Sequence, residues 1–259
     1  MLPAIHDTGT GPAVLFLHAF TLDASQWDHQ VAALSDDMRC VRVDLWGCGS
    51  SPAPPAGEPA LEGFARAVLA ALDSLNIDRV AVVGLSMGGY LAFTLWRMAP
   101  ERIRALALCN TRATADAAGA RADRLAMAEQ VEREHSVESI VEPMVSRLLS
   151  PSAQEEAHIV DPVRGRIRRC SPAGIAFAQR AMAARPDSTA LLASIDVPTL
   201  VIAGSRDALI PTPEVRAMAD GITGARYREL ESGHLSNLEL PRAVNKELAE
   251  LLAAATMGS

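Results

Sequence analysis

Short apolar runs rich in aliphatic residues recur along the chain and predict buried β-strands. They occupy residues 13–18, 39–44, 79–84, 104–109, 199–204 and 225–230. The strongest, VAVVG and TLVIAG, are continuously apolar up to a closing glycine, which is typical of strands covered on both faces. Residues 4–8 precede the first strong strand and leave little material for an opening hairpin.

Segments with helical periodicity lie between these runs. Residues 58–76 place five apolar side chains at steps of three and four, which predicts one apolar stripe on a helix. Further helices are predicted over residues 87–98, 213–221 and 241–254. The alternation of strands and helices predicts an α/β fold with a mostly parallel sheet and helices on both faces.

One long stretch, residues 111–194, interrupts this alternation. It contains no convincing strand, is rich in Ala, Arg and Glu, and carries several prolines. We interpret it as a set of short helices inserted before the last two strands, covering the carboxyl edge of the sheet as a cap. The expected organisation is a core of residues 1–110 and 195–259 and a helical cap of residues 111–194.

Composition and charge limit the classes of partner and the location that the protein can have. The chain has 259 residues, of which 49% are hydrophobic, so it can bury a substantial core. A net charge of −7 disfavours a nucleic-acid partner, because phosphate binding needs a basic face. No apolar run reaches the ~18 residues of a membrane helix. The N-terminus also lacks the basic start and apolar stretch of a secretion signal, so we expect a cytoplasmic protein.

The four cysteines are Cys40, Cys48, Cys109 and Cys170. None forms a C-x-x-C pair, and none has histidine partners at metal-binding spacing, so no metal site is expected. We expect all four to be reduced, as is usual in the cytoplasm, with a structural disulfide as the alternative.

The strongest chemical signal is the segment Gly84-Leu85-Ser86-Met87-Gly88, a G-x-S-x-G pattern between a predicted strand and a predicted helix. A serine at the apex of such a tight turn adopts a strained backbone, and the two glycines remove steric clashes. The helix N-terminus behind it favours a developing negative charge. Ser86 is therefore the candidate nucleophile, and the alternative is a glycine-rich turn with a solvated serine.

A serine hydroxyl needs a base, and the base needs a carboxylate that fixes its tautomer. His234 follows the last predicted strand and Asp207 the strand before it, so both are expected at the edge where Ser86 emerges. The alternatives are an exposed loop histidine and a solvent-facing turn aspartate. Asp187 and Asp196 compete with Asp207, but the first lies in the cap segment and the second at the opposite edge.

The residues His18-Ala19-Phe20 follow the first strong strand and reach the same edge. We predict that the backbone N–H groups of Phe20 and Met87 form an oxyanion hole. His18 is expected to support this loop rather than act as the base. His18, Trp27 and Trp46 are the predicted walls of a substrate pocket.

The segments LFLHAF, VDLWGCGSS, GLSMGGY, PTLVIAGSRDALIP and SGHLSNLELP stand in the order and spacing of the α/β-hydrolase superfamily, which the chain resembles over most of its length. GLSMGG, LCNT and residues 182–192 are similar to small carboxylesterases and 3-oxoadipate enol-lactonases. Two departures stand out. Ala19 replaces a frequent glycine that adopts a positive φ, and residues 45–49 replace a common arginine-and-histidine turn.

The resemblance implies the α/β-hydrolase fold and a serine hydrolase without metal or organic cofactor. Ser86 would attack a carbonyl carbon and form an acyl-enzyme, His234 would transfer the protons, and Asp207 would stay ionised. We expect a carboxylesterase-type enzyme that acts on small-molecule esters. C–C bond hydrolysis is a distant alternative, and perhydrolysis is a side activity that such sites allow.

Two further alternatives stay open. A 3-oxoadipate enol-lactonase or related lactonase would need an arginine to bind the substrate's carboxylate. Candidates in the cap are Arg112, Arg166, Arg168, Arg169 and Arg180. A non-catalytic ligand receptor of this fold is the other alternative, and the intact set of Ser86, Asp207 and His234 argues against it.

Overall fold

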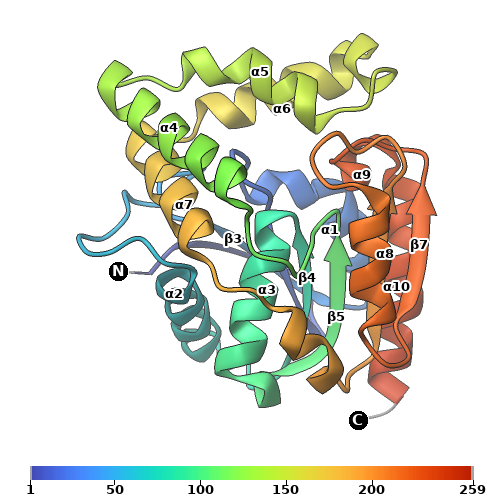
Figure 1. The fold of residues 1–259 in the computed structure, drawn as a ribbon. Coiled ribbons are helices and arrows are strands. Elements are labelled where there is room, and N and C mark those ends of the chain that lie inside the picture. The colour runs from blue at the N-terminus through green and yellow to red at the C-terminus, as the bar shows by residue number, and fades with distance from the viewer. Residues whose placement is uncertain (1, 258–259) are drawn as a thin grey trace.

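A central sheet organises the computed structural model, which describes residues 2–257 (Figure 1). Within these residues the sheet has seven strands in the order β1-β3-β2-β4-β5-β6-β7. The strands are β1 (Ala4–Thr8), β2 (Ala13–Leu17), β3 (Arg39–Asp44), β4 (Val80–Leu85), β5 (Ile103–Cys109), β6 (Thr199–Gly204) and β7 (Arg226–Leu230). Strand β1 pairs antiparallel with β3, and all other neighbours are parallel, so the predicted α/β fold with a mostly parallel sheet is confirmed.

Burial along the strands follows their place in the sheet. Strands β2, β4 and β6 are buried at every residue, as their apolar sequences predict. The edge strand β7 instead carries charged side chains, and its Arg226 and Arg228 both pair with Glu247. Such charges protect an edge strand against pairing with another chain.

Helices cover both faces of the sheet (Figure 1). They are α1 (Asp28–Leu34), α2 (Leu61–Ser74), α3 (Met87–Met98), α8 (Thr212–Asp220), α9 (Ser236–Glu239) and α10 (Pro241–Met257). Helices α2 and α3 pack together on one face, and α1 and α10 pack together on the other. The predicted stripe of α2 is buried at Leu61, Phe64, Val68 and Leu72.

The structure adds elements that the apolar pattern did not predict, among them β1, α1 and the short helix α9. Residues 4–8 form β1 although no hairpin follows, because they pair with the distant strand β3, with Ala4 opposite Asp44. Helix α1 is short, and one of its buried residues is Gln30, whose amide donates to Asn245. A buried glutamine hides the apolar stripe by which a helix is recognised in a sequence.

Four helices lie between β5 and β6, above the carboxyl edge of the sheet (Figure 1). They are α4 (Ala118–Glu134), α5 (Glu138–Leu148), α6 (Ala157–Arg168) and α7 (Pro172–Ala184). Helix α4 packs on α7, and α5 packs on α6. The helices thus fall where the cap was expected, and the division of the chain at residues 111 and 194 stays a prediction.

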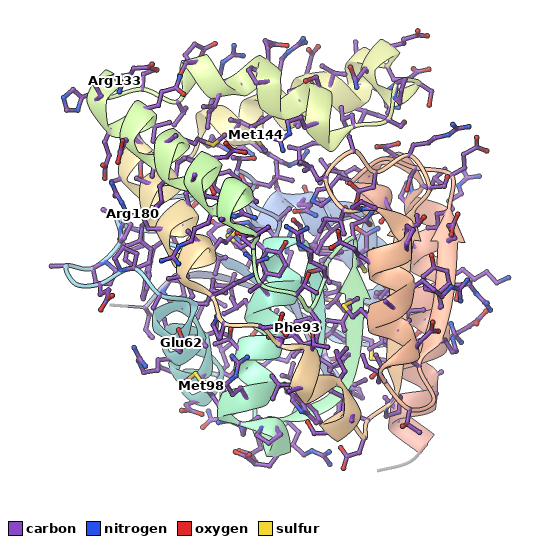
Figure 2. The ribbon with its side chains drawn as sticks, viewed as in Figure 1. Glu62, Phe93, Met98, Arg133, Met144 and Arg180 are labelled. Atoms are coloured by element: carbon purple, nitrogen blue, oxygen red, sulfur yellow. A yellow bond between two sulfur atoms is a disulfide. The ribbon has the colours of Figure 1, made fainter. Side chains whose placement is uncertain are left out.

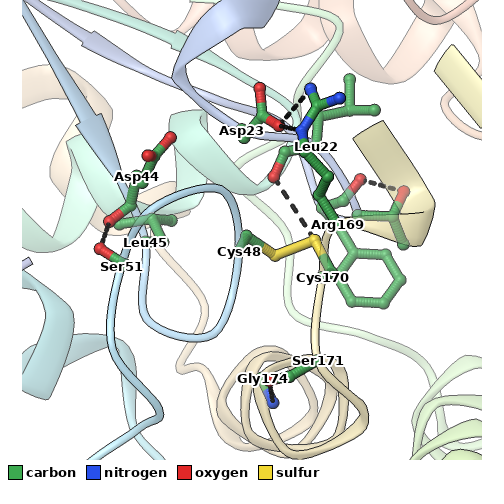
Figure 3. Close-up of a disulfide and its surroundings, with 12 residues drawn as sticks. Leu22, Asp23, Asp44, Leu45, Cys48, Ser51, Arg169, Cys170, Ser171 and Gly174 are labelled. Atoms are coloured by element: carbon green, nitrogen blue, oxygen red, sulfur yellow. Dashed lines mark hydrogen bonds and ion pairs between the residues drawn. A yellow bond between two sulfur atoms is a disulfide. The ribbon is translucent and has the colours of Figure 1, made fainter. Parts of the chain in front are cut away.

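A disulfide joins Cys48 to Cys170 with an S–S distance of 2.11 Å (Figure 3). The expectation that all four cysteines are reduced is therefore wrong. The two residues are 122 positions apart, and the loop after β3 meets the start of α7 where the Ser171 N–H donates to the Gly47 carbonyl at 2.6 Å. The spacing of the cysteines in the sequence does not predict this contact. Structural disulfides are rare in the cytoplasm, so this bond does not support the cytoplasmic expectation.

Cys40 and Cys109 are free and buried within β3 and β5. Burial raises the pKa of the Cys40 thiol to about 11 and that of the Cys109 thiol to about 12. Both are therefore protonated and unreactive near neutral pH. Between residues 2 and 257, no helix is long and apolar enough to cross a membrane.

Candidate active site

Ser86 stands alone between β4 and α3 with φ 56° and ψ −113°, in the sparsely populated left-handed half of backbone space. The two glycines of the motif make this turn possible. A Cβ on Gly84 would lie 2.3 Å from the Gly88 carbonyl oxygen, and a Cβ on Gly88 would lie 2.1 Å from the Leu17 carbonyl oxygen. Hydrogen bonds fix the strained residue, because its N–H donates to the Cys109 carbonyl at 2.9 Å and its carbonyl accepts from the Thr111 hydroxyl at 2.9 Å.

His234 and Asp207 form a buried pair. Nδ1 of His234 lies 2.8 Å from Oδ2 of Asp207, and each side chain is 1% exposed. An Nδ1–H that donates to a carboxylate leaves Nε2 as the free proton acceptor. Ser86 and His234 border the same cavity, so the structure brings the three predicted side chains to one place.

Asp207 is oriented by several donors. Its Oδ1 accepts the Leu209 N–H at 2.8 Å and the Ile210 N–H at 3.1 Å, while its Oδ2 also accepts from the Asn110 amide at 3.1 Å. Burial by itself would raise the pKa of Asp207. The nearby His234 and these hydrogen bonds outweigh burial and hold that pKa below its usual value, which keeps the carboxylate ionised.

Asn110 is a buried residue of this site that sequence reasoning did not select. It follows β5 with φ 46°, and its amide also donates to the Gly233 carbonyl at 3.2 Å. Its Oδ1 accepts the Ser236 hydroxyl at 2.6 Å. One side chain thus connects the loops of Asp207 and His234. Its position directly after a strand, at the carboxyl edge, is the signal that could have identified it.

The predicted oxyanion loop follows β2. Within residues 2–257 the Phe20 N–H has no hydrogen-bond acceptor, and the Met87 N–H opens helix α3, where a helix leaves its first N–H groups free. The Ala19 N–H is occupied by the Gln26 side chain at 2.8 Å. The positive φ of this loop falls on Thr21, at 68°, and not on Ala19. The alanine that replaces the usual glycine is therefore accommodated.

His18 holds this loop from within the core. Its Nδ1 lies 2.8 Å from the Ala19 carbonyl and its Nε2 accepts the Leu45 N–H at 2.9 Å, so the proton is on Nδ1. Burial lowers the pKa of His18, which keeps the ring neutral. Since both ring nitrogens are occupied, His18 is a structural support of the loop.

A cavity of about 260 Å³ lies between the core and the cap. It is bordered by Phe20, Ser86 and His234 from the core and by Met127, Met144 and Met182 from the cap. Figure 2 shows Met144 on the underside of the cap, facing the core. Flexible methionines give such a wall the ability to fit differently shaped apolar groups.

None of the three predicted pocket residues borders this cavity, and these assignments need correction. His18 is fully buried, and both of its ring nitrogens are hydrogen-bonded within the core. Trp27 is buried against Phe16, with ring centroids 5.3 Å apart. Trp46 stacks on Phe64 at 5.0 Å and meets Phe177 edge-on at 6.0 Å. Large aromatic side chains gain most from packing in the core, and the sequence alone does not distinguish a core indole from a pocket wall.

Three arginines border the cavity: Arg112, Arg124 and Arg147. Only the first was among the predicted anion-binding candidates. The other four candidates are engaged elsewhere, with Arg166 on Ser25, Arg168 on Glu138, Arg169 on Asp23 and Arg180 on Glu132. Figure 2 shows Arg180 on the outer flank of the cap.

Two of these arginines, Arg112 and Arg124, share a buried carboxylate with Arg185, which does not border the cavity. Asp116, 1% exposed, pairs with Arg112 at 3.0 Å, with Arg185 at 2.7 Å and with Arg124 at 2.5 Å. Arg112 also reaches Glu214 at 3.2 Å.

Within the described part of the chain, no group of three or more His, Cys, Asp or Glu residues could hold a metal ion.

Comparison with known proteins places the chain in a fold family. Residues 12–136 match the family model described as the alpha/beta hydrolase fold. The chain is 29% identical over 235 residues to 3-oxoadipate enol-lactonase 2 of Acinetobacter baylyi, covering 90% of this chain and 86% of that protein.

Two solved structures are similar over nearly their whole length. A thermophilic esterase from Thermogutta terrifontis, with malate bound, is 37% identical with a TM-score of 0.93, covering 97% of this chain and 93% of that one. The enol-lactonase from Burkholderia xenovorans LB400 is 30% identical with a TM-score of 0.89, covering 96% of each chain.

Proposed function

Because the chain belongs to the α/β-hydrolase family, we propose that it is a serine carboxylic-ester hydrolase that cleaves small esters through an acyl-enzyme. The observation that carries the proposal is the buried His234–Asp207 pair at 2.8 Å, at a cavity that Ser86 also borders. A hydroxyl nucleophile, an imidazole with a free nitrogen and an ionised carboxylate are the groups that acyl transfer requires.

In the first half of the reaction, Ser86 Oγ attacks the ester carbonyl carbon while His234 Nε2 takes the hydroxyl proton. The tetrahedral oxyanion accepts hydrogen bonds from the N–H groups of Phe20 and Met87, which are free to donate. The C–O bond to the alcohol then breaks. The alcohol leaves with the proton held by His234, and Ser86 carries the acyl group.

In the second half, His234 takes a proton from water as the water oxygen attacks the acyl carbon. The second tetrahedral intermediate collapses, Ser86 regains the proton, and the acid leaves. Asp207 stays ionised in both halves, because the surroundings of its carboxylate lower its pKa. Its charge stabilises the imidazolium that forms twice per turnover.

A second candidate, an enol-lactonase, is favoured by the arginines of the cavity. The guanidinium groups of Arg112, Arg124 and Arg147 border the cavity, whereas Asp123 is the one acidic residue among its described lining residues. These guanidinium groups would stabilise a substrate that carries its own carboxylate. The chemistry is the same for both candidates, since a lactone is a cyclic ester.

The basic experiment follows release of p-nitrophenol from p-nitrophenyl acetate. We expect turnover by the wild type and its loss in Ser86→Ala, with an unchanged circular dichroism spectrum. A wild type that is as inert as Ser86→Ala towards a broad panel of esters and lactones would instead support a ligand receptor. Comparing dimethyl succinate with its monomethyl half-ester separates the two hydrolases, because only the half-ester carries a carboxylate.

A further inference from the structure

The turn after cap helix α5 lies against the loop that carries His234. The carbonyl of Leu148, the last residue of α5, accepts the His234 N–H at 3.1 Å and the Leu235 N–H at 3.2 Å. A Cβ on Gly233 would lie only 2.3 Å from the Ser150 nitrogen. The two backbone segments are therefore in direct contact, and only a glycine allows the approach.

Glu239 closes this contact from the core side. It ends helix α9, one turn after His234, and its Oε1 accepts the Ser150 N–H at 3.0 Å. Its Oε2 accepts the Ser150 hydroxyl at 2.6 Å and the Gly233 N–H at 3.0 Å. One carboxylate thus binds both the cap turn and the residue that precedes His234.

We propose that Glu239 is a positioning residue that fastens the cap turn at Leu148–Ser150 to the His234 loop, so that cap and imidazole hold one relative position. The inference rests on the proposed function, in which His234 transfers the proton. A carboxylate suits the task because all three partners are donors. An amide would turn an NH₂ group towards one of them and leave that donor unpaired.

The contact has a consequence for substrate binding. Met144, Arg147 and Leu148 belong to α5 and border the cavity, and Leu148 is also the residue bonded to the His234 backbone. A substrate that presses on α5 therefore acts on the segment that positions the imidazole. Loss of Glu239 should lower kcat through the geometry of proton transfer, with a smaller effect on KM.

The test compares Glu239→Ala and Glu239→Gln with the wild type by steady-state kinetics and by amide hydrogen exchange. We expect kcat to fall by ~10–100-fold in Glu239→Ala, as for a small misplacement of a catalytic group, and by less in Glu239→Gln. Exchange should accelerate at the amides of Ser150, Gly233 and His234 and stay unchanged in β4. Ser150→Ala removes the hydroxyl bond to Glu239, together with the hydroxyl's contacts to Ser152 and to the Ala153 N–H, and keeps the two N–H bonds to Glu239. It should give a few-fold loss of kcat, which tests the contact if Glu239→Ala does not fold.

The matched control is Glu247→Gln, which weakens ion pairs to Arg226 and Arg228 at the far edge of the sheet. It should leave kcat and the local amides unchanged. An unaltered kcat and unaltered local exchange in Glu239→Ala would overturn the proposal, as would an equal loss of kcat in the control. If the wild type hydrolyses no ester, the proposed function fails, and the exchange at Gly233 and His234 still decides whether the contact exists.

Discussion

The core and the cap hold their parts of the candidate site with different kinds of interaction. In the core, Ser86 directly follows the end of β4 and Asp207 lies in the loop that follows β6, and buried neutral groups such as His18 and Asn110 fix the surrounding loops. In the cap, Arg112 and Arg124 of the cavity are fixed by Asp116, and the start of α7 is fixed by the Cys48–Cys170 bond. Local backbone geometry thus places the core groups, whereas buried ion pairs and one covalent bond place the cap.

This difference predicts a division of effects. Changes at the strand ends should alter the rate of the chemical step and leave the fold intact. Changes in the cap should alter stability and the choice of substrate and affect the chemical step less. Glu239 is the exception that joins the two regions, because it bonds to both.

The largest expected effect is that of Asp207→Asn in the core. An asparagine cannot stabilise the imidazolium, and its amide favours the wrong tautomer of His234, so kcat should fall by up to ~10⁴-fold. The melting temperature should change little. The measurement is kcat with p-nitrophenyl acetate beside thermal unfolding. A loss below tenfold would show that another carboxylate orients His234. The position of Asp207 after its strand would then not have identified the catalytic carboxylate.

The sequence was informative where structure depends on local pattern. The strand β4, the turn at Ser86 and the helix α3 are neighbours in the chain, and their glycines are required by clashes within that turn. His234 and Asp207 could be selected because parallel strands end at one edge of the sheet. The position of each residue after its predicted strand was therefore sufficient to select it as a candidate site residue.

The sequence was uninformative where position depends on distant contacts. Nothing near Cys48 indicates that Cys170 lies beside it, because the meeting of the two loops is created by the packing of α7. Trp46 packs among aromatic rings from α2 and α7, which only the folded cap brings together. The same reason explains why Arg124 and Arg147 were missed, since helix periodicity does not say which charged face borders a cavity.

The disulfide gives the next largest effect, on stability. A bond that closes a loop of 122 residues restricts the unfolded chain, and its loss should lower the free energy of unfolding by up to about 4–5 kcal/mol. We expect the double variant Cys48→Ala/Cys170→Ala to melt at a lower temperature, with kcat changed less than twofold at 25 °C. Reductant should lower the melting temperature of the wild type and not that of the variant. A wild type insensitive to reductant under unfolding conditions would contradict the bond.

A smaller effect is expected from Arg124→Gln, which tests recognition of charge by the cap. If a substrate carboxylate binds this guanidinium, KM for the monomethyl half-ester of succinate should rise by ~10–100-fold, while KM for dimethyl succinate stays nearly constant. Arg180→Gln is the matched control, because it also breaks a cap ion pair, with Glu132, away from the cavity. Equal changes of KM for both substrates would show that Arg124 shapes the cavity without recognising a charge.

The smallest expected effect is the loss, at acid pH, of the stability that the buried carboxylate of Asp116 contributes to the cap. Burial would raise the pKa of Asp116, but hydrogen bonds from Arg185 and Arg124 and their charges hold that pKa far below its usual value of 3.8. A carboxyl with a lowered pKa in the folded state contributes stability that is complete above the unfolded value and is lost as the pH falls towards the folded one. Wild type and Asp116→Asn should therefore differ by a constant free energy of unfolding above about pH 5, and the difference should shrink by about 1 kcal/mol at pH 3. Urea unfolding at each pH measures it, and taking the difference removes the other carboxylates. A gap that stays constant down to pH 3 would mean that Asp116 is not held ionised by the cap arginines.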